Sequence, residues 1–317
     1  MFVKGQDPQF TQFFSNPLYL APSFAGAIEA SRITSMYRSQ WRGVGNYVTY
    51  TFSYDHYFDA FNSGFGVLFL KDAAGTARLG TTSIGLQYSY NFKIFDQWHV
   101  RPGIHFNYIQ TGLDYSQLEF SSQVDAQNGA GGGITPDAPP KDKVGDVDVS
   151  SSILIYTRKL WFGGTWEHLL QPEVSLYLTD DKIPFKYSAF AGIELIKKGH
   201  LLKPVDETLT FAALYKKQSN FNQLDFGLYW FKLPIVAGVW VRGIPRAYGE
   251  ETRRLQVGDA VAVLAGYKVS TFSIGYSYDF TISRLITSTQ GSHEISFVFN
   301  FKHERKKKIT SIPCPAF

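Results

Sequence analysis

The chain has 317 residues, of which 18% are charged and 16% are aromatic. About a quarter of the residues of an ordinary globular domain are charged, so this chain is poor in charge and rich in aromatic side chains. Its net charge of +4 is too small and too dispersed to indicate nucleic-acid binding, and its single cysteine, Cys314, excludes an intramolecular disulfide.

Residues 1–29 form the first of three regions that we expect. Within it, residues 6–26 contain Pro8, Pro17 and Pro22 with aromatic residues between them. Such a segment cannot form a regular helix or a central strand. We expect an extended plug or strap that packs against one mouth of the following domain, and a contact surface for another protein is compatible with this prediction.

Residues 30–302 form the second region, in which short segments alternate between apolar and polar residues. In residues 83–90, for example, Ile84, Leu86, Tyr88 and Tyr90 fall on one face of a strand, while Ser, Gly and Gln fall on the other. Counting such segments gives about fourteen strands. They are expected at residues 30–41, 46–58, 63–72, 78–93, 97–112, 147–158, 160–168, 185–197, 204–217, 219–232, 235–242, 256–268, 271–281 and 292–302.

The two strand faces differ in composition. One face is apolar and aromatic, and the other carries Ser, Gly, Thr, Gln and Asn rather than many Lys and Glu. This split is typical of strands between lipid and a wet or packed lumen. No stretch approaches the roughly 18 to 20 apolar residues of a membrane-spanning helix. The sequence therefore predicts an all-β fold with one domain, a transmembrane antiparallel up-and-down β-barrel.

The connections between these strands fall into two classes. Long connections at 113–146, 169–184, 243–255 and 282–291 all follow odd-numbered strands, whereas connections after even-numbered strands are mostly short. Long extracellular loops and short periplasmic turns give this pattern in outer-membrane barrels. We therefore expect both termini, and the strap, on the periplasmic side. The longest connection contains a Gly- and Pro-rich run at 128–140 that could plug the lumen, cap the barrel or be mobile.

An outer-membrane location also requires export. Met1 to Gly5 lack the charged region and the complete apolar region of a secretory signal. We expect that the sequence omits most of the signal peptide and that the mature chain begins near Gln6.

Residues 303–317 form the third region, a basic tail on the periplasmic side. It follows a last strand with Ile295, Phe297, Phe299 and Phe301 on one face and Glu294 on the other. A solvated basic run is the commoner explanation for such a tail, while contact with anionic lipid or with a partner protein stays open.

Reactive side chains form no recognisable site. The seven histidines show no paired metal-ligand spacing, and no Gly-rich run follows a strand and opens a helix. We expect no catalytic residue, metal or cofactor. His99, Arg101 and His105 with Asn107, and Glu294 with His293, are candidates for a polar cluster in the lumen. A hydrolase would need a serine such as Ser273 or Ser296 beside His105, which the sequence does not establish.

Residues 6–26 carry a family resemblance. Their sequence, Gln-Asp-Pro-Gln-Phe-Thr-Gln-Phe-Phe-Ser-Asn-Pro-Leu-Tyr-Leu-Ala-Pro-Ser-Phe-Ala-Gly, closely resembles the opening of the PorP/SprF family, outer-membrane proteins of the Bacteroidota type IX secretion system. Lys71-Asp72 with Gly75, the closing segment Gly291-Ser-His-Glu-Ile-Ser and the terminal Cys314-Pro-Ala-Phe317 are also similar to family features. The resemblance touches both ends and runs through the barrel, but not the loops.

The resemblance implies a non-enzymatic barrel that supports export or surface anchoring of cargo, such as a gliding adhesin or another large surface protein. It implies as partners the translocon, periplasmic ring or lipoprotein subunits, and a cargo C-terminal domain, besides outer-membrane lipid. A core secretion subunit and a cargo-specific anchor both stay open, and the alternative is a passive channel or ligand transporter. The candidate partner-binding residues are Gln6, Asp7, Pro8, Phe10, Asn16, Pro17, Trp41, Tyr177, Tyr248, Lys306, Lys307, Cys314 and Phe317.

Overall fold

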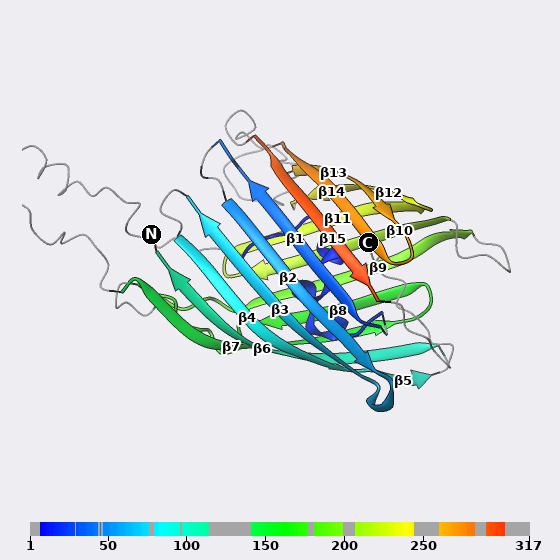
Figure 1. The fold of residues 1–317 in the computed structure, drawn as a ribbon, viewed down its shortest axis with the longest axis horizontal. Helices are drawn as coiled ribbons and strands as arrows, with labels where there is room; N and C mark the ends of the chain where they lie inside the picture. The colour runs from blue at the N-terminus through cyan, green and yellow to red at the C-terminus, as the bar shows by residue number, and fades with distance from the viewer. Residues whose placement is uncertain are drawn as a thin grey trace, which may run out of the picture.

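The computed structural model describes residues 7–28, 30–43, 45, 47–75, 79–95, 97–113, 141–176, 181–198, 207–243, 260–282 and 290–301. Within them, strands form one antiparallel sheet that is tilted and curved (Figure 1). The strands are β1 (Arg32–Gln40), β2 (Tyr47–Phe58), β3 (Ser63–Ala74), β4 (Leu79–Tyr90), β5 (Phe92–Phe95), β6 (Trp98–Gly112), β7 (Lys143–Tyr156), β8 (Leu160–Glu167), β9 (Lys186–Lys198), β10 (Glu207–Gln218), β11 (Phe221–Lys232), β12 (Ile235–Arg242), β13 (Ala260–Lys268), β14 (Phe272–Thr281) and β15 (Ser292–Asn300).

Fourteen of these strands close into a barrel. Each pairs with its neighbours in sequence, and β1 pairs with β15 from Arg32 opposite Asn300 to Gln40 opposite Ser292. The predicted barrel class and strand number are thereby confirmed. The predicted strand at 78–93 is divided at Asn91 into β4 and β5, and β4 and β5 both pair with β6. No helix among the described residues is long and apolar enough to span a membrane.

The two ends of the barrel differ as expected. At one end, which we call the loop end, β6 stops at Gly112 and β7 begins only at Lys143. At the opposite end, which we call the turn end, β11 stops at Lys232 and β12 begins at Ile235. The strand β7 begins four residues earlier than predicted, because its first residues extend the ladder with β6.

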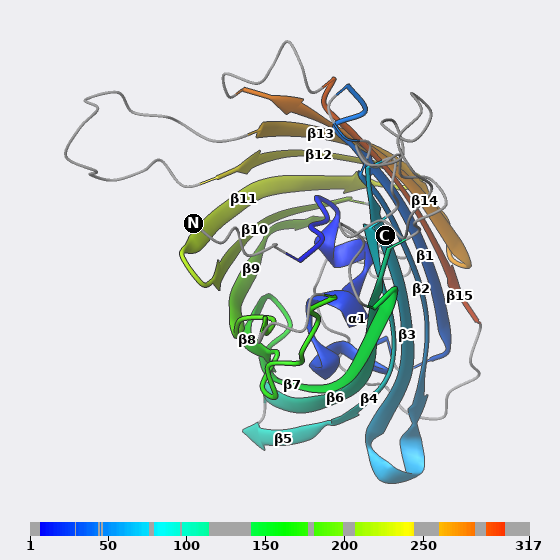
Figure 2. The same ribbon diagram turned by 90° about the vertical axis from the view of Figure 1, so that its left-hand side faces the viewer.

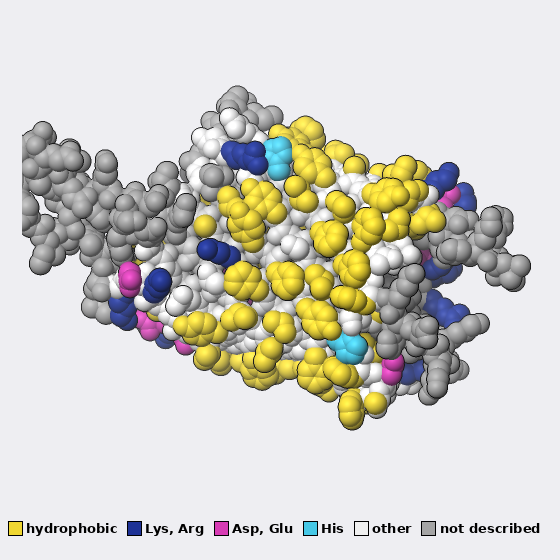
Figure 3. Space-filling model, in the orientation of Figure 1, with side chains coloured by type: hydrophobic (Ala, Val, Ile, Leu, Met, Phe, Trp, Pro, Cys, Tyr) yellow, Lys and Arg dark blue, Asp and Glu magenta, His cyan; other side chains and the backbone are white. Residues whose placement is uncertain are grey.

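The outer face of the barrel is apolar. Ile84 and Leu86 on β4 are 53% and 65% exposed, while the flanking residues Ser83 and Gln87 are buried. Apolar side chains cover the visible outer face, and charged side chains gather toward the two ends (Figure 3). This is the arrangement expected of a wall between lipid and a filled lumen, so the barrel is suited to crossing a membrane.

The N-terminal segment lies inside the barrel, not across one mouth as predicted. Residues 7–28, which we call the plug, include η1 (Phe13–Ser15), α1 (Pro17–Leu20) and η2 (Pro22–Phe24), and the curve of the strands surrounds them in Figure 2. Pro17 and Pro22 open short helical turns, where their missing N–H leaves no hydrogen bond unmade. Nearly all plug side chains from Phe10 to Ala27 are buried.

The lumen wall around the plug is apolar on one side. The plug side chains Phe13, Phe14, Leu20 and Phe24 pack against this side. The rings of Phe14 and Tyr229 lie 3.9 Å apart between centroids. The wall residues in the cluster are Leu154, Tyr156, Trp161, Phe190, Ala212, Leu214, Tyr229, Val236, Trp240, Ala262 and Leu264, which extend from β7 to β13.

The remaining wall is mostly polar. Buried Ser, Thr, Asp, Glu and Arg side chains from β14, β15, β1, β2, β4 and β6 face the plug, as Arg38, Glu294 and Asp279 illustrate. The plug is therefore bound as an amphipathic core element, with aromatic side chains toward one wall and polar backbone and side-chain groups mainly toward the other.

Candidate functional site

The lumen and its plug are the most highly organised polar site among the described residues. The plug runs from the loop end, where Asp7 contacts His168, to the turn end, where Gly26 contacts Asp55. Its contacts fall into three groups along this path, which we call the loop-end anchor, the central network and the turn-end anchor.

The loop-end anchor holds Asp7. Its carboxylate lies 2.9 Å from His168 Nε2 and 3.0 Å from Lys186 Nζ. The opposite ring nitrogen of His168 lies 2.9 Å from Asp148, and Lys186 also pairs with Glu167 at 2.9 Å. Buried charges are stable only when paired in this way.

These ion pairs fix the charge states of the loop-end anchor. Burial alone would lower the pKa of His168, but the carboxylates of Asp7 and Asp148 raise it to about 10. Burial opposes ionisation of Asp7, yet Lys186 and His168 hold its pKa well below the ordinary value of 3.8. His168 is therefore a cation and Asp7 an anion at neutral pH.

The central network joins the plug to the seam where the barrel closes. The guanidinium of Arg38 on β1 donates to Glu294 on β15 and to Asp279 on β14, each at 2.8 Å. Glu294 also accepts the backbone N–H groups of Thr11 at 2.9 Å and Gln12 at 2.7 Å. Arg242 contacts Asp279 as well.

Gln12 also binds the same seam through its side chain. Its amide nitrogen donates to Ser277 on β14 at 3.1 Å, and its amide oxygen accepts from Ser296 on β15 at 2.7 Å. All three side chains are fully buried. One plug residue thus bridges two neighbouring wall strands.

The turn-end anchor binds the other end of the plug. The backbone N–H of Gly26 donates to Asp55 at 2.8 Å, and Asp55 in turn pairs with Arg32 at 2.9 Å. Arg101 on β6 donates to the carbonyl oxygens of Ser23 and Ala25.

Glycines in the wall make room for the plug backbone. A Cβ atom at Gly64 on β3 would lie 1.9 Å from the carbonyl oxygen of Ala25, and one at Gly103 on β6 would lie 2.3 Å from the amide nitrogen of Ser23. Any larger residue at these positions would displace the plug.

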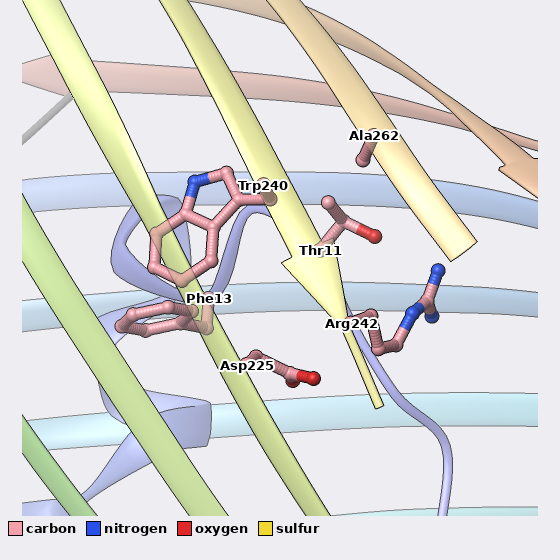
Figure 4. A pocket seen from close by; sticks show the side chains of 6 residues that line it. All are labelled: Thr11, Phe13, Asp225, Trp240, Arg242 and Ala262. Atoms are coloured by element: carbon pink, nitrogen blue, oxygen red, sulfur yellow. The ribbon is translucent and has the colours of Figure 1, made fainter. Parts of the chain in front are cut away.

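A small cavity remains between the plug and β11–β13. It has a volume of about 10 Å³, which is near the minimum for one water molecule. Figure 4 shows Phe13 beside Trp240 at one side of this cavity and Asp225 and Arg242 at the other. Its size gives no room for an organic ligand.

The comparisons with known proteins identify the family. The model of the family described as type IX secretion system membrane protein PorP/SprF matches residues 2–299. The chain belongs to the PorP/SprF family. The match covers the plug together with every strand of the barrel up to Phe299, so the family resemblance of residues 6–26 is confirmed.

Solved structures similar to this PorP/SprF chain are outer-membrane barrels. The outer membrane protein Omp33 of Acinetobacter baumannii is 8% identical, with a TM-score of 0.45, over 86% of this chain and 100% of that one. A deltaS2 mutant of the TodX monoaromatic hydrocarbon channel is 10% identical, with a TM-score of 0.48, over 91% and 94% of the two chains. No curated protein matches the chain.

The structure places several of the predicted partner-binding residues of this PorP/SprF protein in the lumen. Phe10, Asn16 and Pro17 are buried, with Asn16 donating to Thr51 at 2.8 Å, while Asp7 and Pro8 are partly buried at the loop end. Trp41 is half-buried at the loop end, with its ring 5.9 Å from that of Tyr47. The other predicted partner-binding residues lie outside the described residues: Gln6, Tyr177, Tyr248, Lys306, Lys307, Cys314 and Phe317.

The expectation that both termini share the periplasmic side does not fit the described ends of the chain. Asp7 lies at the loop end beside His168, whereas Phe301 follows β15 at the turn end. The prediction had placed residues 1–29 outside the barrel, whereas residues 7–28 pass along the lumen; residues 1–6 and 302–317 lie outside the described residues, so the side of each terminus stays a prediction.

The inward-facing charges were only partly predicted. Arg101, Asp225 and Glu294 are buried in the lumen as expected, and His105 faces inward too. His293 was wrongly grouped with Glu294, since adjacent residues of a strand face opposite sides, and His293 Nδ1 lies 2.8 Å from the hydroxyl of outward-facing Tyr276. Four further inward-facing charged residues were not predicted, although each occupies an inward position in a strand whose alternation was recognised. These residues are Arg32, Arg38, Asp55 and Asp279.

The described residues contain no group of His, Cys, Asp and Glu arranged to hold a metal ion. Ser296, one of two serines considered for a hydrolytic site, donates its hydroxyl hydrogen to Gln12.

Proposed function

We propose that this protein is a non-enzymatic scaffold of type IX secretion that supports export or surface anchoring of cargo by binding partners at the two ends of a closed barrel. A cargo C-terminal domain would bind at the loop end, and periplasmic machinery would bind at the turn end. The observation that carries this proposal is the plug, which occupies the lumen from Asp7 to Gly26.

The contacts of the plug favour a permanent filling over a removable gate. Its aromatic residues Phe13, Phe14 and Phe24 are at most 4% exposed and pack into the main apolar cluster. Burying one such side chain stabilises a fold by about 1.5 to 3 kcal/mol. Withdrawal of the plug would also leave Arg38, Glu294 and Asp279 without their plug partners. Fourteen strands also enclose less space than the sixteen to eighteen strands of an open porin.

A disulfide that locks the plug to the wall tests whether cargo crosses the lumen. Ser23→Cys with Ser152→Cys introduces two thiols at a contact where the Ser23 amide donates to Ser152 Oγ at 2.8 Å. The change is made with Cys314→Ser, and the bond is verified by loss of free thiols. We expect secretion and surface display of cargo to equal those of the two single-cysteine variants.

A locked plug that blocks secretion, with recovery on adding reductant, would contradict the scaffold proposal. It would show that the plug must move and would support the alternative of a conduit or transporter.

Affinity purification in mild detergent tests the two proposed ends separately. Recovery of a surface protein through its C-terminal domain, lost on shortening residues 113–146, supports cargo anchoring at the loop end. Recovery of periplasmic ring or lipoprotein subunits, lost on removing residues 303–317, supports a role within the machinery. If neither class of partner is recovered, this result would contradict the scaffold proposal.

A further inference from the structure

The outer face of the barrel carries two basic residues near the loop end. Lys71 on β3 lies in the same outward-facing row as Phe65 and Val67, which are 49% and 38% exposed. Arg42 follows β1 and is exposed as well. Figure 3 shows Lys or Arg side chains among the apolar side chains of this face, toward the loop end. A cation in such a row requires water or an anion, because hydrocarbon does not solvate charge.

Two tyrosines join these cations along the wall. Tyr50 on β2 lies directly opposite Lys71, and Tyr37 on β1 lies directly opposite Tyr50. The rings of Tyr37 and Tyr50 are 5.1 Å apart between centroids. Ser39, two residues beyond Tyr37 on the same face, accepts a hydrogen bond of 2.9 Å from Nε of Arg42. We call the outward-facing group of Lys71, Tyr50, Tyr37 and Arg42 the basic patch.

The basic patch offers hydrogen-bond donors over a short distance. Lys71 and Tyr37 are two strand spacings apart, which is about 10 Å. No described residue accepts a hydrogen bond from the Lys71 ammonium or from the hydroxyl of Tyr37 or Tyr50. The guanidinium of Arg42 keeps donors beyond the one that binds Ser39. The patch can therefore bind an external acceptor without losing contacts of its own.

No carboxylate shares this face with the basic patch. The carboxylates in the described residues of β14, β15 and β1 to β4 face the lumen, and they are Asp55, Asp72, Asp279 and Glu294. Asp72 accepts a hydrogen bond of 2.6 Å from the buried Thr49. At the turn end, by contrast, the exposed Lys198 lies 3.7 Å from Glu207. The described wall around the patch thus leaves its positive charge unbalanced.

A lipid headgroup with phosphate matches this arrangement. Phosphate oxygens accept two hydrogen bonds from a guanidinium and bind a lysine as a point charge. Tyrosine hydroxyls between the two cations can donate to phosphate or sugar oxygens. Phe52 and Val67 continue the same outward rows toward the turn end and are 48% and 38% exposed, where acyl chains would contact them. Charge and apolar surface are therefore arranged in the order in which a lipid presents phosphate and acyl chains.

We propose that the basic patch binds a phosphate group of lipopolysaccharide in the outer leaflet of the membrane. The inference rests on the proposed function, which takes the loop end as the cell-surface side. On that side the leaflet consists of lipopolysaccharide, whose lipid A carries phosphate and sugar hydroxyls above its acyl chains. Binding would neutralise Lys71 and Arg42 at the level of the headgroups and fix the depth of the barrel in the membrane.

Titration of the purified full-length barrel in detergent with lipid A tests the proposal. We expect Lys71→Ala with Arg42→Ala to weaken the binding at least tenfold, and Lys71→Arg, which keeps the charge, to change it less than threefold. The matched control, Lys198→Ala with Lys232→Ala, removes two exposed turn-end cations and should change the affinity less than twofold. Urea midpoints close to that of the wild type show that the variants are folded.

Two further lipids identify the group that is bound. Lipid A from which phosphate has been removed should bind the wild-type protein at least tenfold more weakly than intact lipid A. Phosphatidylglycerol, which carries phosphate without the sugars, should bind more weakly than intact lipid A.

Three results would each overturn the proposal: lipid A affinity that the double substitution at the patch leaves unchanged, equal binding of lipid A with and without phosphate, or tighter binding of phosphatidylglycerol than of lipid A. Blocked secretion by the locked plug would instead contradict the scaffold function while leaving the binding of lipid A in place.

Discussion

Single charged residues determine how the stability of the bound plug depends on pH. Asp7 is bound by His168 and Lys186, and these contacts raise the pKa of His168 to about 10, against an ordinary value of 6.5. Because the folded-state pKa is the higher one, the stabilisation is complete below about pH 6.5 and declines as the pH rises toward 10. The lowered pKa of Asp7 acts in the opposite direction, and its stabilisation is lost only below about pH 3.8.

We therefore expect His168→Gln to flatten the pH dependence of stability between pH 6.5 and 10. Urea midpoints of the wild type and the variant, measured across this range in detergent, provide the test. The difference between the two proteins should be largest near pH 6 and shrink on the alkaline side. A difference that stays constant with pH would show that contact with the plug does not keep His168 in its protonated form.

Phe14 tests the apolar side of the plug. It is 2% exposed, and its ring lies 3.9 Å between centroids from that of Tyr229. We expect Phe14→Ala to lower the free energy of unfolding by about 3 to 5 kcal/mol, because it leaves a cavity in the main cluster. The matched control is Phe106→Ala, at a wall position that is 57% exposed to lipid. Equal losses at the two positions would contradict the packing of the plug.

At the scale of elements, strand positions could be predicted and plug positions could not. Alternation fixed the strands because each side chain of a wall strand faces either lipid or lumen, and this constraint acts locally along the sequence. The plug has no such period, and its partners are distant, since Thr11 binds Glu294 across 283 positions of sequence. The division at Asn91 was missed for a similar reason, because it depends on where β3 begins.

The plug also stabilises the seam between β14, β15 and β1. We expect Gln12→Leu, which keeps the size of the side chain but removes its bonds to Ser277 and Ser296, to cost about 2 to 3 kcal/mol. Hydrogen exchange should increase most in β14 and β15, while β10 and β11, which Gln12 does not bind, keep their protection. Equal loss of protection in both pairs of strands would show that Gln12 acts on the whole barrel and not on the seam.

At the scale of the whole molecule, the barrel is a closed shell around its own N-terminal segment. Its outer surface is suited to lipid, its lumen is occupied by the plug, and its two ends are where we propose that partner proteins bind. The fold and the family could be recognised from strand alternation and from residues 6–26. The filled lumen could not, because the polar wall residues of a channel and those of a plugged barrel have the same alternation in sequence.

Because the plug fills the lumen, we expect the barrel not to conduct ions, and the conductance of the purified wild-type protein in a planar lipid bilayer tests this. We predict no stepwise current at potentials where an open porin of known conductance, inserted as a control, gives clear steps. Steady open steps from the wild-type protein would contradict a permanently plugged lumen and support a channel.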